Sequence, residues 1–93
     1  MGIRPRLKPT QLAKKLLRIR EALDLSQNQM LERIGLEDQL VRQNISAYER
    51  GEIEPPLPVL LRYAEEAGVC TDVLIDDRKK LPAKLPGTPK HKP

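Results

Sequence analysis

The chain has 93 residues, a length that predicts a single domain with a small hydrophobic core. It contains one cysteine and no tryptophan or phenylalanine, so an internal disulfide framework is excluded and the core must be largely aliphatic. No apolar run approaches the roughly 20 residues of a membrane span. The basic N-terminus is not followed by the apolar run of a secretory signal. We therefore expect a soluble, cytoplasmic protein.

The formal net charge of +4 is distributed unevenly along the chain. Residues 1–11 carry three basic side chains and residues 78–93 carry six, and neither segment has an acidic residue. All 13 acidic residues lie between these two arms, so the central segment is net acidic. An anionic partner such as a nucleic acid would have to be bound by local groups of basic residues or by the arms.

The first residues predict a flexible arm and then a helix. Residues 1–9 combine two prolines with alternating basic residues, and we expect them to be flexible. From Thr10, a candidate helix cap, apolar side chains recur at steps of four, three and four residues. This predicted stripe consists of Leu12, Leu16, Ile19 and Leu23. The basic side chains of the helix, among them Lys15, are expected to lie largely off the stripe.

Helices two and three are predicted on either side of a turn. Helix two begins at Ser26, with Gln29 three residues later to complete a capping box, and a glycine at position 35 ends it. Helix three, at about 41–50, ends at a second glycine. With Ile45 at the centre of its buried face, Val41 and Tyr48 fall on the same side. The opposite, outward face is predicted to hold Gln43, Ser46, Ala47 and Arg50, flanked by Arg42.

Two further helices complete the predicted domain. Pro58 suits the first turn of helix four, where its missing N–H has no helical partner, and Gly68 ends that helix. The predicted core side of helix four consists of Leu60, Leu61, Ala64 and Ala67. Helix five is expected at about 71–76, with Thr71 as its cap.

The composition changes at Arg78, from which prolines alternate with lysines up to residue 93. Such a segment buries too little apolar surface to order itself, so we predict a disordered basic tail. The predicted organisation is an arm at 1–9, an all-α domain of five short helices at 10–77 and a tail at 78–93.

Four short runs of this sequence carry a family resemblance. They are Ile19–Gln27, Ile45–Gly51, Pro55-Pro56 and Ala67-Gly68-Val69. Taken in order, they resemble the Cro and phage-repressor family of helix-turn-helix DNA-binding regulators, including its xenobiotic-response-element group. The resemblance implies a compact, five-helix, lambda-repressor-like DNA-binding domain over most of the chain. In this family the second helix crosses the DNA backbone and the third enters the major groove.

The resemblance also implies which residues contact DNA. Carried onto this chain, the base-reading positions fall on Arg42, Gln43, Ser46 and Ala47. Arginine can donate two hydrogen bonds to guanine and glutamine can pair with adenine, so the first two suit this role. A phosphate-contacting position falls on Gln27, at the start of helix two, with Ser26 and Arg50 as further phosphate candidates.

Arg20 and Glu49 match a pair of positions that form a buried ion pair between helices one and three in several family members. A bidentate pair here would fix the angle of the reading helix. Its net stabilisation can still be small, because both charges must be desolvated.

Two features depart from the family pattern. Nine residues separate Gly35 from Ile45, a connection longer than usual by about one helical turn. The extra residues, placed within Leu36–Leu40, either lengthen the turn or extend helix three backwards with Asp38 as its cap. In the second case Gln39 becomes a further candidate base reader.

The second departure is acidic. Glu52 and Glu54 follow the glycine of helix three, where many family members have basic residues.

Three function classes therefore stay open. The first is a sequence-specific regulator that binds double-stranded DNA, alone or as a homodimer. The second is an antitoxin-like or adaptor module that acts by protein–protein contact. The third is a non-specific nucleic-acid binder that acts through the basic tails.

Enzyme chemistry is not indicated. There is no catalytic grouping, no zinc-ligand spacing and no phosphate-binding glycine loop, so we predict no enzyme, no cofactor, no metal and no small-molecule site. Cys70 and His91 stand alone. The acidic residues Asp72, Asp76 and Asp77 lack the loop of a calcium site and are expected to form a solvated edge.

Overall fold

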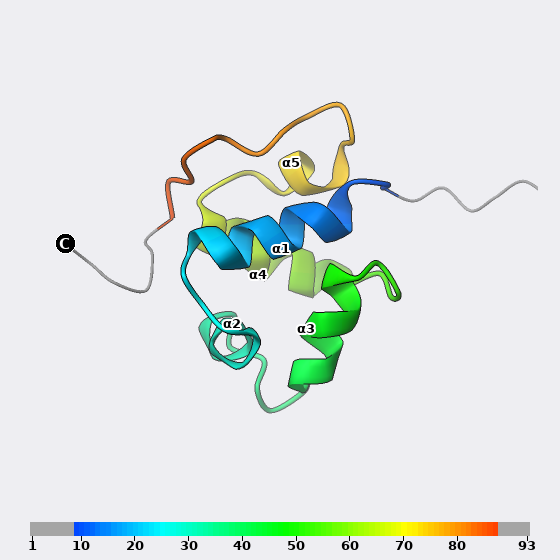
Figure 1. Ribbon diagram of the computed structural model, residues 1–93, viewed down its shortest axis with the longest axis vertical. Coiled ribbons are helices and arrows are strands. Elements are labelled where there is room, and N and C mark those ends of the chain that lie inside the picture. Colours follow the sequence, from blue (N-terminus) through cyan, green and yellow to red (C-terminus); the bar gives the residue numbers. More distant parts are fainter. Residues whose placement is uncertain (1–8, 88–93) are drawn as a thin grey trace, which may run out of the picture.

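Five α-helices follow one another in the computed structural model, which describes residues 9–87 (Figure 1). They are α1 (Leu12–Ala22), α2 (Gln27–Arg33), α3 (Arg42–Glu49), α4 (Leu57–Ala67) and α5 (Thr71–Ile75). No strand occurs within the described residues, so the predicted all-α class is confirmed. The expectations for the arm at 1–8 and for residues 88–93, His91 included, concern parts of the chain outside the described residues.

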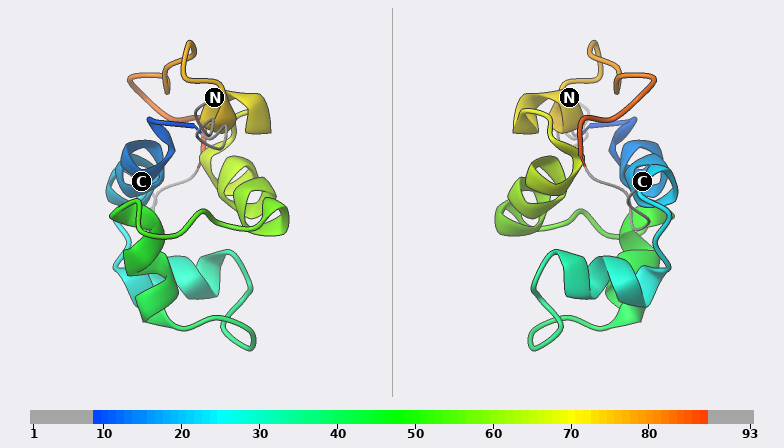
Figure 2. Two further views of the ribbon diagram at one scale, coloured as in Figure 1. Left: turned by 90° about the vertical axis from the view of Figure 1, so that its right-hand side faces the viewer. Right: turned by 90° about the vertical axis from the view of Figure 1, so that its left-hand side faces the viewer.

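Helix α1 is central to the arrangement. It contacts α3, α4 and α5, whereas α2 packs against α3. The two views in Figure 2 place α5 at one end of the molecule and α2 at the other. Figure 1 shows that the chain also enters α3 at the end occupied by α2.

The predicted stripe of α1 forms the middle of the core, because all four of its members are at most 5% exposed. Tyr63 of α4 and Leu74 of α5 are fully buried beside it. One expectation for α4 is wrong, since Leu61 is 49% exposed while Leu60 is buried. The buried face of α4 follows positions 60, 63, 64 and 67, and residue 61 lies about 100° away around the helix.

The capping box of α2 is confirmed. The N–H of Gln29 donates to Ser26 Oγ at 3.1 Å, and the N–H of Ser26 donates to Gln29 Oε1 at 2.8 Å. Gly35, with φ of +73°, lies just beyond the last turn of α2, in the left-handed conformation that was predicted there.

The extra residues between α2 and α3 lengthen the turn and do not extend α3. The amides of Gln39 and Leu40 both donate to the Leu36 carbonyl at 2.9 Å, which closes a separate turn. The N–H of Val41 donates to Asn44 Oδ1 at 2.9 Å and α3 begins at Arg42, which excludes the alternative in which Asp38 caps a longer helix. Val41 itself is 58% exposed and extended, with φ of −121°. The helical spacing that placed it on the buried face does not apply to a residue before the helix.

A distant carboxylate caps the first helix. Asp77, just after α5, accepts hydrogen bonds from the N–H groups of Thr10 and Gln11 at 2.9–3.0 Å and from the Thr10 hydroxyl at 3.0 Å. Thr10 is therefore not the cap that the sequence predicted, and Gln11 occupies the N-cap position without a side-chain bond. Asp77 is also not simply part of a solvated edge, because its carboxylate satisfies N–H groups at the start of α1.

A buried lysine caps α5 in return. Lys15 is only 7% exposed, contrary to its expected place off the apolar stripe. Its Nζ donates to the Val73 carbonyl at 2.7 Å and the Asp76 carbonyl at 2.9 Å, at the C-terminal end of α5. The N-cap position of α5 belongs to Cys70 and not to Thr71.

Asp77→Asn should lower stability at neutral pH and weaken its dependence on acid. The N–H groups of Thr10 and Gln11 hold the pKa of the Asp77 carboxyl below its usual range. This stabilisation is therefore present above the unfolded-state pKa of about 3.9 and is lost as the pH falls through the lower folded-state pKa. Urea denaturation between neutral pH and about pH 2 measures it. Asp38→Asn, at an exposed position in the long turn, is the control. An Asp77→Asn midpoint that fell in acid as steeply as the parent's would contradict the prediction.

Residues 78–87, here called the C-terminal strap, lie against the helices. Leu81 and Leu85 pack on the core cluster, and the N–H of Gly87 donates to the Ala67 carbonyl at 3.0 Å, at the end of α4. A Cβ on residue 87 would lie 1.9 Å from the Glu66 carbonyl oxygen, so this approach requires glycine. The structure thus differs from the disordered tail predicted from residue 78. Leu81 and Leu85, four residues apart, anchor this segment to the core, although its average composition predicts disorder.

No helix within residues 9–87 is long and apolar enough to cross a membrane.

Candidate nucleic-acid interface

The first turn of α3 carries two exposed polar side chains. Arg42 and Gln43 both point into solvent, as does Gln39 in the preceding turn. Behind them, Ile45 and Tyr48 are buried in the core. The predicted reading face therefore starts at the end of α3 that lies beside α2 (Figure 1).

A bidentate ion pair joins this helix to α1. Arg20 Nε lies 2.6 Å from Glu49 Oε2, and its Nη2 donates to Glu49 Oε1 at 3.1 Å. The remaining guanidinium nitrogen donates to the Leu25 carbonyl at 2.9 Å, so the pair is also tied to the connection that leads into α2. The hydrogen bond to Glu49 raises the pKa of Arg20. The side chains are 17% and 4% exposed, respectively, so Glu49 is the more deeply buried partner.

Gln27 extends the ion pair to the surface. Its Nε2 donates to Glu49 Oε1 at 3.1 Å, and its Oε1 accepts from Arg42 Nη1 at 3.2 Å. A continuous chain of hydrogen bonds thus runs from Arg20 through Glu49 and Gln27 to Arg42. The resemblance assigned Gln27 to phosphate, whereas in the structure its side chain holds an expected base reader. Its half-buried amide has both a donor and an acceptor, which suits a bridge between a carboxylate and a guanidinium.

Arg50 is engaged by a neighbouring carboxylate. Its Nε and Nη2 donate to the two carboxylate oxygens of Glu52, each at 2.9 Å, and its Nη1 donates to Ser46 Oγ. The bond with Glu52 raises the pKa of Arg50, and the same bond lowers the pKa of Glu52. Arg50, an expected phosphate contact, is therefore bonded both to Ser46, an expected base reader, and to the carboxylate of Glu52. The pair is exposed, so an anion can displace Glu52 at small cost.

Ala47 does not lie on the outward face as expected. It is 6% exposed. The chain turns back after α3 at Gly51, whose φ is +73°, and the N–H of Glu52 donates to the Ala47 carbonyl at 3.0 Å. Helical spacing alone does not reveal that the chain after α3 folds back toward Ala47. The exposed part of the predicted face therefore consists of Arg42, Gln43 and Arg50, with Ser46 half-buried.

Acidic side chains flank the face at both ends. Glu37 and Asp38 are exposed in the long turn before α3, and Glu52 and Glu54 are exposed after it. Like charges repel, so these carboxylates weaken the attraction of phosphate groups to both flanks. Within residues 9–87, no group of three or more His, Cys, Asp and Glu residues could hold a metal ion.

The chain's similarity to known proteins agrees with this geometry. A family model for the Cro/C1-type helix-turn-helix matches residues 16–74, more than half of the chain. The matched segment spans all of α2, α3 and α4. No curated protein and no solved structure matches the chain significantly.

Proposed function

Because the chain belongs to the Cro/C1-type helix-turn-helix family of DNA-binding regulators, we propose that it is a transcriptional regulator that binds double-stranded DNA sequence-specifically and reads the major groove with α3. The observation that carries this proposal is the placement of Arg42. Its guanidinium is exposed at the start of α3 and is held by Gln27, which is itself fixed by the buried Arg20–Glu49 pair. A side chain held in this way loses little conformational freedom when it pairs with a base.

We assign the DNA contacts accordingly. Arg42 and Gln43 read base edges, because both are exposed in the first turn of α3, the helix that enters the major groove. Arg50 turns from Glu52 to a phosphate, which also releases the Ser46 hydroxyl that it binds. Ser46 then adds a base contact one turn further along α3. Ser26 and Gln27 contact the backbone at the start of α2, while the Gln27 amide also orients Arg42. Membership of the xenobiotic-response-element group is part of this proposal.

The exposed acids support a second candidate function. Glu37 and Asp38 before α3, and Glu52 bonded to Arg50, lower the positive charge around the helix. An antitoxin-like or adaptor module that binds a basic protein surface would use the same carboxylates. The non-specific binder has less support, because two of the four basic residues of the C-terminal strap are already paired, Arg78 with Asp76 and Lys79 with Asp72.

Selection of bound sequences from random DNA duplexes tests the proposal. A regulator enriches a defined site, and one half-site or two spaced by about one DNA turn would indicate a monomer or a homodimer. Affinities for the selected site and for an unrelated duplex, measured across salt concentrations, separate the alternatives. Equal affinities with a steep salt dependence indicate a non-specific binder. An interaction module binds neither duplex tightly, and either of these two results contradicts the proposed function.

A further inference from the structure

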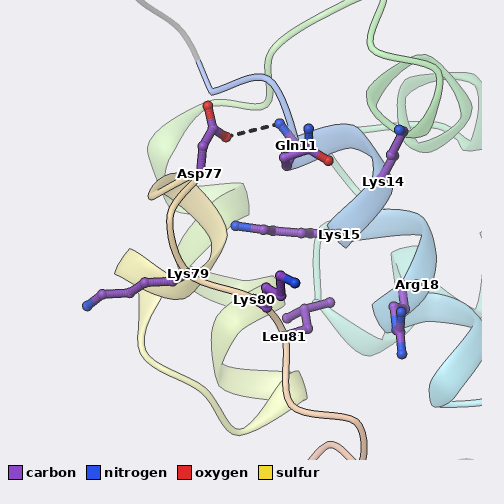
Figure 3. Close-up of a pocket in the computed structure, with 8 residues that line it drawn as sticks. All are labelled: Gln11, Lys14, Lys15, Arg18, Asp77, Lys79, Lys80 and Leu81. Carbon is purple, nitrogen blue, oxygen red and sulfur yellow. Dashed lines mark hydrogen bonds between the residues drawn. The ribbon is translucent and has the colours of Figure 1, made fainter.

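A pocket of about 380 Å³ lies between α1 and the start of the C-terminal strap (Figure 3). The residues that line it are Gln11, Lys14, Lys15, Arg18, Asp77, Lys79, Lys80 and Leu81. Five of the eight are cations and one is an anion. Figure 3 shows Lys14 and Arg18 along α1, with Lys80 and Leu81 facing that helix from the strap. Lys15 lies between the two groups.

The charged groups of this pocket divide into two sets. Lys15 is held by two carbonyls of the α5 end, Asp77 by the N–H groups at the start of α1, and Lys79 donates to Asp72 outside the pocket. These three are part of the fold.

The second set consists of Lys14, Arg18 and Lys80. All three are exposed, and within residues 9–87 none forms an ion pair. Three positive charges without an ion-pair partner among the described residues therefore line the pocket, together with Lys15 and Leu81. Clustered like charges repel one another, so an anion bound among them is favoured by attraction and by relief of that repulsion.

We propose that this pocket binds a small polyanion with adjacent phosphate groups, such as a nucleoside diphosphate. The volume lies in the range of pockets for small ligands. A guanidinium supplies a planar fork and two flexible ammonium groups supply point charges, a combination that suits several phosphate oxygens. A concave site of this size fits a compact ligand better than the convex backbone of a duplex. It also lies on the side of α1 beside the strap, away from the start of α3.

The sequence did not predict a small-molecule site, for an identifiable reason. The α1 cations are separated from Lys80 by more than 60 residues in the chain. The pocket exists only because Leu81 and Leu85 dock a segment whose composition predicts disorder.

Titration of the full chain with inorganic pyrophosphate, followed by amide chemical shifts, tests the proposal. Sodium chloride at matched ionic strength is the reference. Saturable shifts are expected in residues 11–18 and 77–81, with those of residues 42–50 unchanged. ADP is titrated in parallel, and tighter binding than that of pyrophosphate identifies a nucleotide as the ligand.

Two variants of the strap provide the matched comparison. Lys80→Glu should weaken pyrophosphate binding about tenfold or more, the effect of one lost charge-assisted contact. Lys84→Glu changes the charge of the chain equally but lies outside the pocket lining, so it should leave the affinity nearly unchanged. The spectra of both variants without ligand report whether the strap stays docked. Arg18→Gln, on the helix side, tests the site without altering the strap.

Three results would overturn the proposal. One is equal weakening by Lys80→Glu and Lys84→Glu, which indicates diffuse attraction by net charge. Another is the absence of saturation, or saturation with shifts centred on α3. The third is displacement of pyrophosphate by a random-sequence duplex that shifts the same amides, which would make the pocket part of a second DNA-phosphate surface.

Discussion

Arg20→Ala should lower the free energy of unfolding by about 3 kcal/mol, the lower end of the loss expected when one partner of a buried ion pair is removed. The reason is the burial of the other partner. Glu49 is 4% exposed, and without Arg20 its carboxylate would keep only the hydrogen bond from Gln27. Glu49→Ala should cost less, because the Arg20 guanidinium is 17% exposed and still donates to the Leu25 carbonyl. Urea denaturation of the purified variants measures both values.

A double-mutant cycle separates the pair from its surroundings. Once both side chains are removed, no unpaired buried charge remains, so the double variant should be less destabilised than the sum of the single variants. Arg50→Ala is the matched control, because the Arg50–Glu52 pair is bidentate but exposed and should contribute little to stability. Additive effects of Arg20→Ala and Glu49→Ala would contradict a coupled pair. A loss in Arg50→Ala as large as in Arg20→Ala would contradict the role of burial.

The features predicted correctly from the sequence are those that local chemistry determines. The stripe of α1 follows from helical spacing, and the start of α2 follows from two side chains three residues apart. The glycines at 35 and 68 have φ of +73° and +75°, which a glycine after a helix indicates. Each of these signals lies within one or two turns of the element that it predicts.

The features that were missed depend on contacts between distant segments. Asp77 replaces Thr10 as the cap of α1, and Lys15 is buried because the end of α5 offers it two carbonyls. The strap docks through Leu81 and Leu85, although the average composition of the segment predicts disorder. None of these partners can be identified from residues near the position in question, because a capping carboxylate 67 residues away leaves no local pattern.

The candidate site shows the same division. Helical spacing predicted that Arg42 and Gln43 are exposed, and the family resemblance predicted the ion pair between Arg20 and Glu49. Neither indicated that the Gln27 amide would connect the two.

Arg42→Ala should relax the preference for bases at one or two positions of the selected DNA site and cost about 1–3 kcal/mol of binding free energy there, if the guanidinium makes a bidentate contact with guanine. Gln43→Ala should relax a neighbouring position. Binding to an unrelated duplex should fall much less, because non-specific affinity comes from phosphate contacts. A repeat of the selection on each single variant, together with affinities for the parent site, measures the change. Lys84→Ala, in the strap, is the control that removes a positive charge remote from α3. If Arg42→Ala and Gln43→Ala both keep the parent's base preferences, then Gln39 reads the groove in a shifted register or α3 does not read DNA.

The hydrogen-bond chain adds a sharper expectation for Gln27. A residue that only meets phosphate would weaken binding equally on all sequences when it is replaced. In this structure Gln27 also orients Arg42, so Gln27→Ala should in addition relax the preference at the base pair that Arg42 reads. Residues in one network are coupled, so Gln27→Ala combined with Arg42→Ala should relax that position no further than Arg42→Ala alone. Independent, additive losses at that base pair would show that Gln27 contacts phosphate without positioning the arginine, and the bridge from the buried Glu49 would then have no part in base recognition.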